Sequence, residues 1–180
     1  MIDPGWGPFL FDTSAESWFA RTGEPGAGGW WREYLRTHPV HVSSITVYER
    51  MRGYAMLWRG ANPGRRAAIE AARLAYLESP RRVWPVDAAT AAVGGEIAAL
   101  IPEPPTPPKR SHRLAESRAE RLARWRFDGL VAATALVSAM TLIHNNPSDF
   151  EAIRSGIERN PERFPRLGPL NLVRCGAIAA

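Results

Sequence analysis

Short apolar runs alternate along the chain with stretches whose apolar residues have helical spacing. The runs at 8–12 (PFLFD), 40–44 (VHVSS), 81–87 (RRVWPVD) and 141–144 (TLIH) have the length of strands, and each leads into residues that can begin a helix. A further apolar run at 169–175 is expected to close one edge of the sheet. Strands that alternate with helices form parallel sheets covered by helices, so we expect an α/β protein of this kind.

Helices are expected in the intervals between these strands. They span 15–22, 30–39, 45–59, 65–78, 88–102, 113–126, 127–140 and 145–157, with a loop at 24–29. Ser44 and Thr46 are candidate caps for the helix at 45–59. Asp128 is expected at the N-terminus of the apolar helix at 127–140, where the helix dipole favours a negative charge.

Two segments before this apolar helix interrupt the regular alternation. Residues 102–112 (PEPPTPPKRSH) begin with five prolines in seven residues, which predicts a stiff surface insertion or a ligand for an aromatic groove. Residues 113–126 are expected to form an arginine-rich helix. Its arginines either form a solvated face or contact RNA, and the candidates for that contact are Arg121, Arg124 and Arg126.

Composition limits the class of protein. The 180 residues are 45% hydrophobic and 23% charged, which is ordinary for a globular protein, and we expect one domain over 1–180. The net charge of +5 favours a polyanionic partner such as nucleic acid, although a GC-rich genome that encodes arginine freely explains it equally well. The single cysteine, Cys175, excludes an internal disulfide and a cysteine-based zinc site.

We expect a cytoplasmic protein. A reducing cytosol suits the single cysteine, and the sequence contains no run of about 18 apolar residues that would span a membrane. Asp3 and Pro4 stand where a signal peptide would carry basic residues, so no export signal is expected.

Four acidic residues carry the candidate chemistry: Asp12, Glu49, Asp128 and Asp149. Each lies beside the end of an expected strand or the start of an expected helix, and these points meet at one edge of a parallel sheet, where ligands usually bind. Carboxylates in one cleft repel each other unless a divalent cation neutralises them. Without clustered cysteine or histidine, the predicted cation is Mg²⁺ or Mn²⁺.

Each acid also has an ordinary structural interpretation. Asp12 and Asp149 can cap helices, Glu49 can be a solvated helix residue, and Asp128 can interact with a helix dipole. Thr13 and Ser14 either cap the helix after Asp12 or orient a water at the site.

The sequence around these acids resembles the PIN domain family, and within it the VapC-type toxins of bacterial toxin–antitoxin pairs. The resemblance runs from about residue 9 to about residue 157 and rests on four blocks in order: FLFDTSAESWFA, VSSITVYE, FDGLVAATAL and TLIHNNPSDFEAI. The second block contains Ser43, Thr46 and Glu49, and the fourth contains Asn146 before Asp149.

The resemblance implies a three-layer α/β/α sandwich with a central, mainly parallel sheet, and a Mg²⁺- or Mn²⁺-dependent endoribonuclease. It also implies a homodimer and an antitoxin that covers the site. Asp12, Glu49 and Asp128 are the expected metal ligands, with Asp149 either behind them or on a second ion. Asn146 would hold the loop or a water, and Thr13, Ser14 and Thr46 would support the site.

Some features depart from the family's pattern. The region 101–126 is longer than the expected turn, and Arg126-Phe127 stands where a Gly-Asp pair is common. An arginine there would bind RNA phosphate or weaken the metal site. Two alternatives to the ribonuclease stay open. One is a catalytically inactive PIN-like module that binds RNA or protein, and the other is a DNA-directed nuclease or a phosphatase that uses the same acids.

Overall fold

The computed structural model describes residues 2–21, 25–105 and 116–179, and it contains one five-stranded sheet. The strands are β1 (Phe9–Phe11), β2 (Val40–Ser43), β3 (Arg81–Trp84), β4 (Thr141–His144) and β5 (Leu172–Arg174). All neighbouring strands are parallel, in the order β3-β2-β1-β4-β5, so β1 lies at the centre. The expected strands are all present, including the edge strand near the end of the chain.

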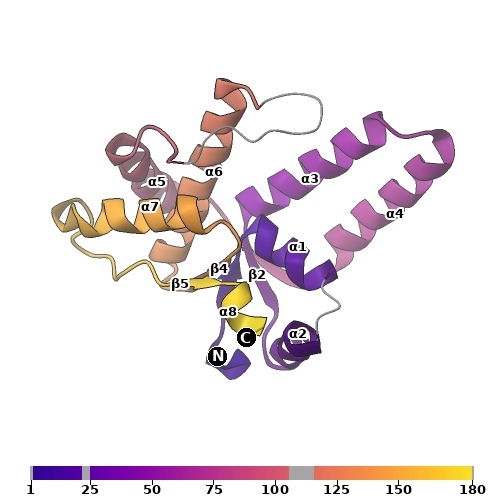
Figure 1. The fold of residues 1–180 in the computed structure, drawn as a ribbon, viewed down its shortest axis with the longest axis horizontal. Helices are drawn as coiled ribbons and strands as arrows, with labels where there is room; N and C mark the ends of the chain where they lie inside the picture. Colours follow the sequence, from indigo (N-terminus) through magenta and orange to yellow (C-terminus); the bar gives the residue numbers. More distant parts are fainter. Residues whose placement is uncertain (1, 22–24, 106–115, 180) are drawn as a thin grey trace.

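Helices connect the strands and cover both faces of the sheet (Figure 1). The elements are η1 (Pro4–Trp6), α1 (Thr13–Arg21), α2 (Pro25–Thr37), α3 (Ser44–Arg59), α4 (Pro63–Glu78), α5 (Ala88–Leu100), α6 (Arg118–Val137), α7 (Pro147–Glu158), η2 (Pro161–Arg163) and α8 (Gly176–Ala179). Of these, α3 and α4 lie side by side as a hairpin that extends away from the sheet (Figure 1).

The alternation of side chains along β1 divides the core into two layers. Leu10 points to one face, where it packs in a cluster with residues of α5, α6 and α7. Phe9 and Phe11 point to the other face, where they pack with residues of α1, α2 and α8. All three residues are at most 2% exposed. The predicted three-layer α/β/α sandwich with a parallel sheet is therefore confirmed.

One long helix replaces the two helices expected at 113–126 and 127–140. α6 begins after a capping box formed by Ser117 and Glu120 and continues without interruption to Val137. The expectation that Asp128 begins a helix was wrong, because nothing between Arg126 and Gly129 breaks the helix. Gly129 is tolerated since it is buried against Ile97 of α5. Asp128 consequently lies in the middle of α6.

Two helix starts also differ from expectation. α2 begins at Pro25, so most of the expected loop at 24–29 is helical; proline suits a first helical position. At the start of α3 the capping side chain belongs to Ser43, whose hydroxyl accepts a hydrogen bond from the Ile45 N–H at 3.4 Å, and not to Ser44 or Thr46. Serine at the last position of β2 therefore ends the strand and begins the helix.

The insertion at 102–112 is described only as far as residue 105, and the first three residues of the expected arginine-rich helix lie outside the described residues. In the part of the chain that is described, no helix is both long enough and apolar enough to cross a membrane.

Candidate functional site

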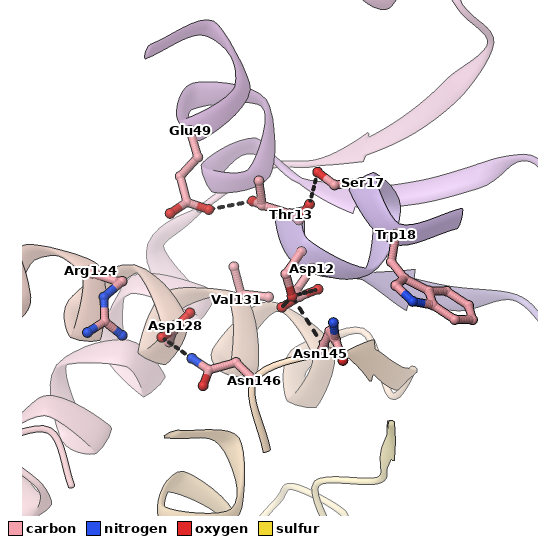
Figure 2. A pocket seen from close by; sticks show the side chains of 11 residues that line it. Asp12, Thr13, Ser17, Trp18, Glu49, Arg124, Asp128, Val131, Asn145 and Asn146 are labelled. Atoms are coloured by element: carbon pink, nitrogen blue, oxygen red, sulfur yellow. Dashed lines mark hydrogen bonds between the residues drawn. The ribbon is translucent and has the colours of Figure 1, made fainter. Parts of the chain in front are cut away.

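A cavity of about 460 Å³ opens at the carboxyl edge of the sheet, beside the end of β1 (Figure 2). Its lining comes from α1, α3, α6 and the loop after β4. The lining residues are Asp12, Thr13, Ser14, Ser17, Trp18, Glu49, Arg124, Asp128, Val131, Asn145 and Asn146. Three of the four predicted acids therefore reach one pocket from three different parts of the chain.

Asp12 follows β1 directly and is held by the first turn of α1. The Ser14 hydroxyl contacts both of its carboxylate oxygens, at 2.9 and 2.7 Å, and the Ala15 N–H donates to Oδ1 at 2.5 Å. Asp12 is therefore both a helix cap and a candidate ligand, because the same carboxylate caps α1 and faces the pocket. Burial raises the pKa of Asp12 to about 6, against these hydrogen bonds and with the help of the Glu49 charge.

Glu49 reaches the pocket from the second turn of α3. The Thr13 hydroxyl donates a hydrogen bond to Glu49 Oε2, so the residue after Asp12 fixes the second acid (Figure 2). Ser14 connects α1 to the loop after β4, since its hydroxyl accepts a hydrogen bond from the Asn145 N–H at 3.2 Å. Two adjacent hydroxyl residues, Thr13 and Ser14, therefore join α1 to α3 and to the loop after β4.

Asp128 enters the pocket from the middle of α6. Asn146 Nδ2 donates to Asp128 Oδ2 at 3.2 Å and to Asp149 Oδ2 at 2.8 Å, so one amide bridges two acids. Burial raises the pKa of Asp128 well above its usual range, and the charges of Asp12, Asp149 and Glu49 raise it further. The charges of the other three acids therefore all act on the Asp128 carboxyl.

Asp149 lies behind this pocket and is completely buried. Its Oδ2 atom accepts from Arg124 Nη1 at 2.8 Å as well as from Asn146. The same guanidinium donates to both carboxylate oxygens of Glu116 at 3.1 Å, from Nε and from Nη2. Arg124 is thus a fixed positive charge between two carboxylates on the wall of the pocket.

The remaining predicted residues do not line the cavity. Thr46 is completely buried in the first turn of α3, and its hydroxyl has no hydrogen-bond partner among the described residues. Arg121 pairs with Glu103 at 3.4 Å, and Arg126 is exposed on α6. Of the three arginines proposed to contact RNA, Arg124 alone belongs to the pocket lining.

Four lining residues were not predicted: Ser17, Trp18, Val131 and Asn145. Helical spacing indicates two of them, because Ser17 and Trp18 lie four residues after Thr13 and Ser14 and share their face of α1. Val131 lies one turn after Asp128 on α6 by the same rule.

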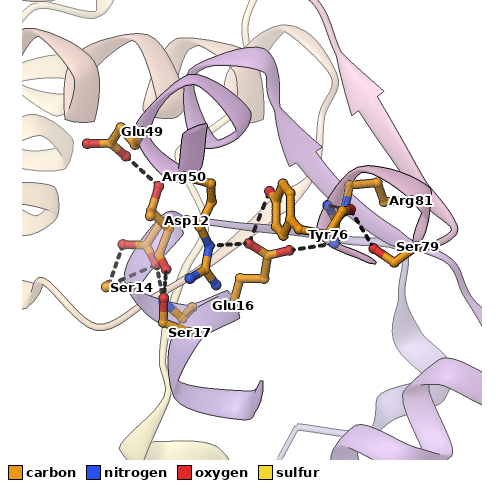
Figure 3. A network of polar contacts seen from close by, with 11 residues as sticks. Asp12, Ser14, Glu16, Ser17, Glu49, Arg50, Tyr76, Ser79 and Arg81 are labelled. Atoms are coloured by element: carbon orange, nitrogen blue, oxygen red, sulfur yellow. Dashed lines mark hydrogen bonds and ion pairs between the residues drawn. The ribbon is translucent and has the colours of Figure 1, made fainter. Parts of the chain in front are cut away.

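A buried ion-pair network next to the site fixes α1 against α3, α4 and β3 (Figure 3). Glu16, one turn after Asp12, accepts from Arg50 Nε at 3.0 Å and lies 3.3 Å from Arg81 Nη2. The Tyr76 hydroxyl donates to Glu16 at 3.4 Å, and the Arg81 guanidinium lies 3.5 Å from the centre of the Tyr76 ring. Arg50 directly follows Glu49 on α3, so the network lies beside the acidic site.

The donor set suits a hard cation in its chemistry, because Asp12, Glu49 and Asp128 present only oxygen atoms to the cavity. The acids do not form a preorganised coordination site: within the described residues, no group of three or more His, Cys, Asp or Glu side chains has metal-binding geometry. Asp12 and Glu49 instead bond to Ser14 and Thr13.

Of three comparisons with known proteins, the one with solved structures finds matches. A scan against models of protein families finds no match, and neither does a search of curated proteins. Solved structures do match. A chain of the VapBC2 complex from Rickettsia felis, bound to a DNA fragment from its promoter, is 14% identical with a TM-score of 0.57, covering 92% of this chain and 97% of that one. A chain of the DNA-bound VapBC from Salmonella typhimurium is 20% identical with a TM-score of 0.52, covering 93% and 97%.

A third match is a chain of FitAB bound to the IR36 DNA fragment, 20% identical, with a TM-score of 0.56 over 93% of this chain and 95% of that one. At such identities the likeness concerns the fold alone, but it extends over nearly the whole length of each chain. The protein therefore has the PIN-like fold that its sequence blocks predict, and it shares this fold with chains of the VapBC and FitAB structures.

Proposed function

We propose that this protein is a metal-dependent endoribonuclease and the toxin of a toxin–antitoxin pair. The observation that carries the proposal is the convergence of Asp12, Glu49 and Asp128 on one cavity at the carboxyl edge of a parallel sheet. The fold shared with chains of VapBC and FitAB complexes supports it.

Asp12, Glu49 and Asp128 would hold a Mg²⁺ or Mn²⁺ ion. When bound, such an ion acts as a Lewis acid and neutralises charge on the phosphodiester that is attacked. The chain's own groups prepare the site for it. Ser14 and the Ala15 N–H orient Asp12, Thr13 holds Glu49, and Asn146 orients Asp128.

An RNA phosphodiester is the proposed substrate. The net charge of +5 favours a polyanion over a neutral substrate. Trp18 on the cavity wall offers an aromatic face on which a base can stack, as in other single-strand binding sites. Arg126, which is exposed on α6, stays a candidate contact for the RNA backbone outside the cavity.

Cleavage of total cellular RNA by the purified protein tests the proposal. We expect discrete fragments with Mg²⁺ or Mn²⁺, and their loss with EDTA and in Asp12→Asn. Asp87→Asn is the matched control: it makes the same charge change at an exposed cap of α5, where asparagine caps equally well, and should cleave normally.

Absence of cleavage at any metal concentration, from folded and partner-free protein, would contradict the proposal. RNA binding that persists in EDTA would then favour the inactive binding module. Cleavage of single-stranded DNA in preference to RNA would instead favour the DNA-directed nuclease.

We also propose an antitoxin partner, as the toxin–antitoxin complexes among the structural neighbours suggest. The α3–α4 hairpin exposes large apolar side chains that a protein partner would cover: Met56 (57% exposed), Leu57 (54%), Trp58 (42%) and Leu77 (48%). Co-purification with the product of a small neighbouring reading frame, and its loss in Met56→Asp, would test the assignment. The proposed homodimer is tested by light scattering of the isolated chain.

A further inference from the structure

Arg124 brings a permanent positive charge into the acidic site from within the same chain. It lies four residues before Asp128 on α6, so both side chains share one face of that helix. Its side chain is only 17% exposed and forms part of the cavity wall (Figure 2). An arginine cannot lose its proton in a protein, so this charge is present at every working pH.

We propose that the site binds a single divalent cation through Asp12, Glu49 and Asp128, and that Arg124 takes the place of a second ion by holding Asp149. This inference rests on the proposed function. It assigns Asp149 to the guanidinium rather than to a metal.

The contacts of Asp149 support this assignment. The residue is completely buried, does not line the cavity, and already accepts hydrogen bonds from Arg124 and Asn146. A metal ion approaching this carboxylate would meet a fixed positive charge 2.8 Å from its Oδ2 atom. Charges of the same sign repel strongly where water is excluded.

The contacts of Arg124 make it difficult to displace. Two nitrogen atoms of its guanidinium bond to Glu116, each at 3.1 Å, and the third bonds to Asp149. Paired bonds from a planar guanidinium to a carboxylate are strong and directional. Expelling the side chain would break its bonds to two carboxylates, which is costly for buried groups.

The arrangement has a consequence for chemistry at the site. In two-metal nucleases the second ion balances charge on the phosphate being attacked. Arg124 would neutralise Asp149 where such an ion would otherwise be needed, without a metal. The protein would then need only one site to be filled by Mg²⁺, and its activity would depend on the ion concentration without cooperativity.

Titration of the metal-free protein with Mn²⁺ tests the inference without RNA. Calorimetry and electron paramagnetic resonance measure the number of ions bound per chain and their affinity. We expect one ion per chain in the wild type. Asp149→Asn should still bind one ion with a Kd within about threefold of wild type, whereas Asp128→Asn should weaken binding at least about tenfold. These two variants make the same chemical change on opposite sides of the cavity wall.

Arg124→Ala should bind a second Mn²⁺, because it releases Asp149 and Glu116 from their cation. Arg118→Ala is the matched control, since it removes the same charge from an exposed part of α6 where the partner is Glu103. It should leave the count at one ion. If Arg124→Ala does not fold, the count in wild type and in Asp149→Asn decides.

Two ions in the wild type, a loss of affinity in Asp149→Asn equal to that in Asp128→Asn, or a single ion in folded Arg124→Ala would each overturn the inference. Absence of any Mn²⁺ binding by the wild type would overturn the proposed function as well. The two failures are therefore distinguishable.

Discussion

The ionised Asp12 carboxylate should destabilise the folded protein when no metal is bound. Its pKa is raised from 3.8 to about 6, so the folded state holds a proton that the unfolded state releases in this range. Stability from this proton is fully present below pH 4 and is lost as the pH rises through 6. A rise of the pKa from 3.8 to about 6 corresponds to roughly 3 kcal/mol at pH 7.5.

Asp12→Asn should therefore be more stable than the wild type in EDTA at pH 7.5. Asparagine keeps an oxygen that can accept from the Ala15 N–H, so the helix cap survives. It loses part of the bonding to Ser14, and we expect a net gain of about 1–3 kcal/mol. For a chain of this size that is a rise in Tm of roughly 2–10 °C.

Thermal unfolding of both proteins at pH 4 and pH 7.5, each with EDTA and with Mg²⁺, measures the effect. The advantage of the variant should shrink at pH 4, where the wild-type carboxyl is protonated. Mg²⁺ should raise the Tm of the wild type but not that of Asp12→Asn. Asp87→Asn, at an exposed cap, should match the wild type throughout. A variant that is less stable than wild type at pH 7.5 in EDTA would refute the reasoning.

Three further predictions concern stability. His144 is 1% exposed, and burial lowers its pKa from 6.5 to about 4, so the unfolded state takes up the His144 proton at a higher pH than the folded state does. The stability of the wild type relative to His144→Leu should therefore fall by about 3 kcal/mol between pH 7 and pH 4. A stability difference that does not change with pH would contradict this. Glu16→Ala removes the carboxylate from between Arg50 and Arg81, and it should lower the free energy of unfolding in urea by about 3–5 kcal/mol. Glu16→Gln should lower it by less. Equal and small losses in the two variants would show that the network contributes little to stability. Ser117→Ala breaks the capping box of α6 and should lower the free energy of unfolding by about 1 kcal/mol. Ser117→Thr keeps a hydroxyl that can cap the helix and should be nearly as stable as the wild type. A loss of the same size in both variants would argue against capping.

Much of the fold could be predicted from the sequence because its strands are short, apolar and well separated. The apolar residues of PFLFD and TLIH are consecutive, as in strands buried on both faces, and a residue that can begin a helix follows each run. The acids at their ends were predicted for the same reason: in a parallel sheet, position along the chain determines the edge on which a residue lies.

The position of Asp128 in α6 could not be predicted as easily. The change from arginine-rich to alanine-rich residues near 126 resembles a boundary between helices, yet composition alone does not end a helix. The two halves differ because residues from Gly129 onward are mostly buried against the sheet, while the earlier half extends beyond it. The pairing of Arg124 with Asp149 could not be predicted from the sequence either, since the two residues are 25 positions apart.

The continuity of α6 has a consequence for how this protein can vary between species. Each added residue turns a helix by about 100°. A single insertion between Arg124 and Asp128 would turn one of these side chains out of the cavity, whereas insertions before Ser117 leave both unchanged. Natural length differences among close homologues should therefore accumulate before the capping box, and lineages that keep the acids should keep the spacing of α6.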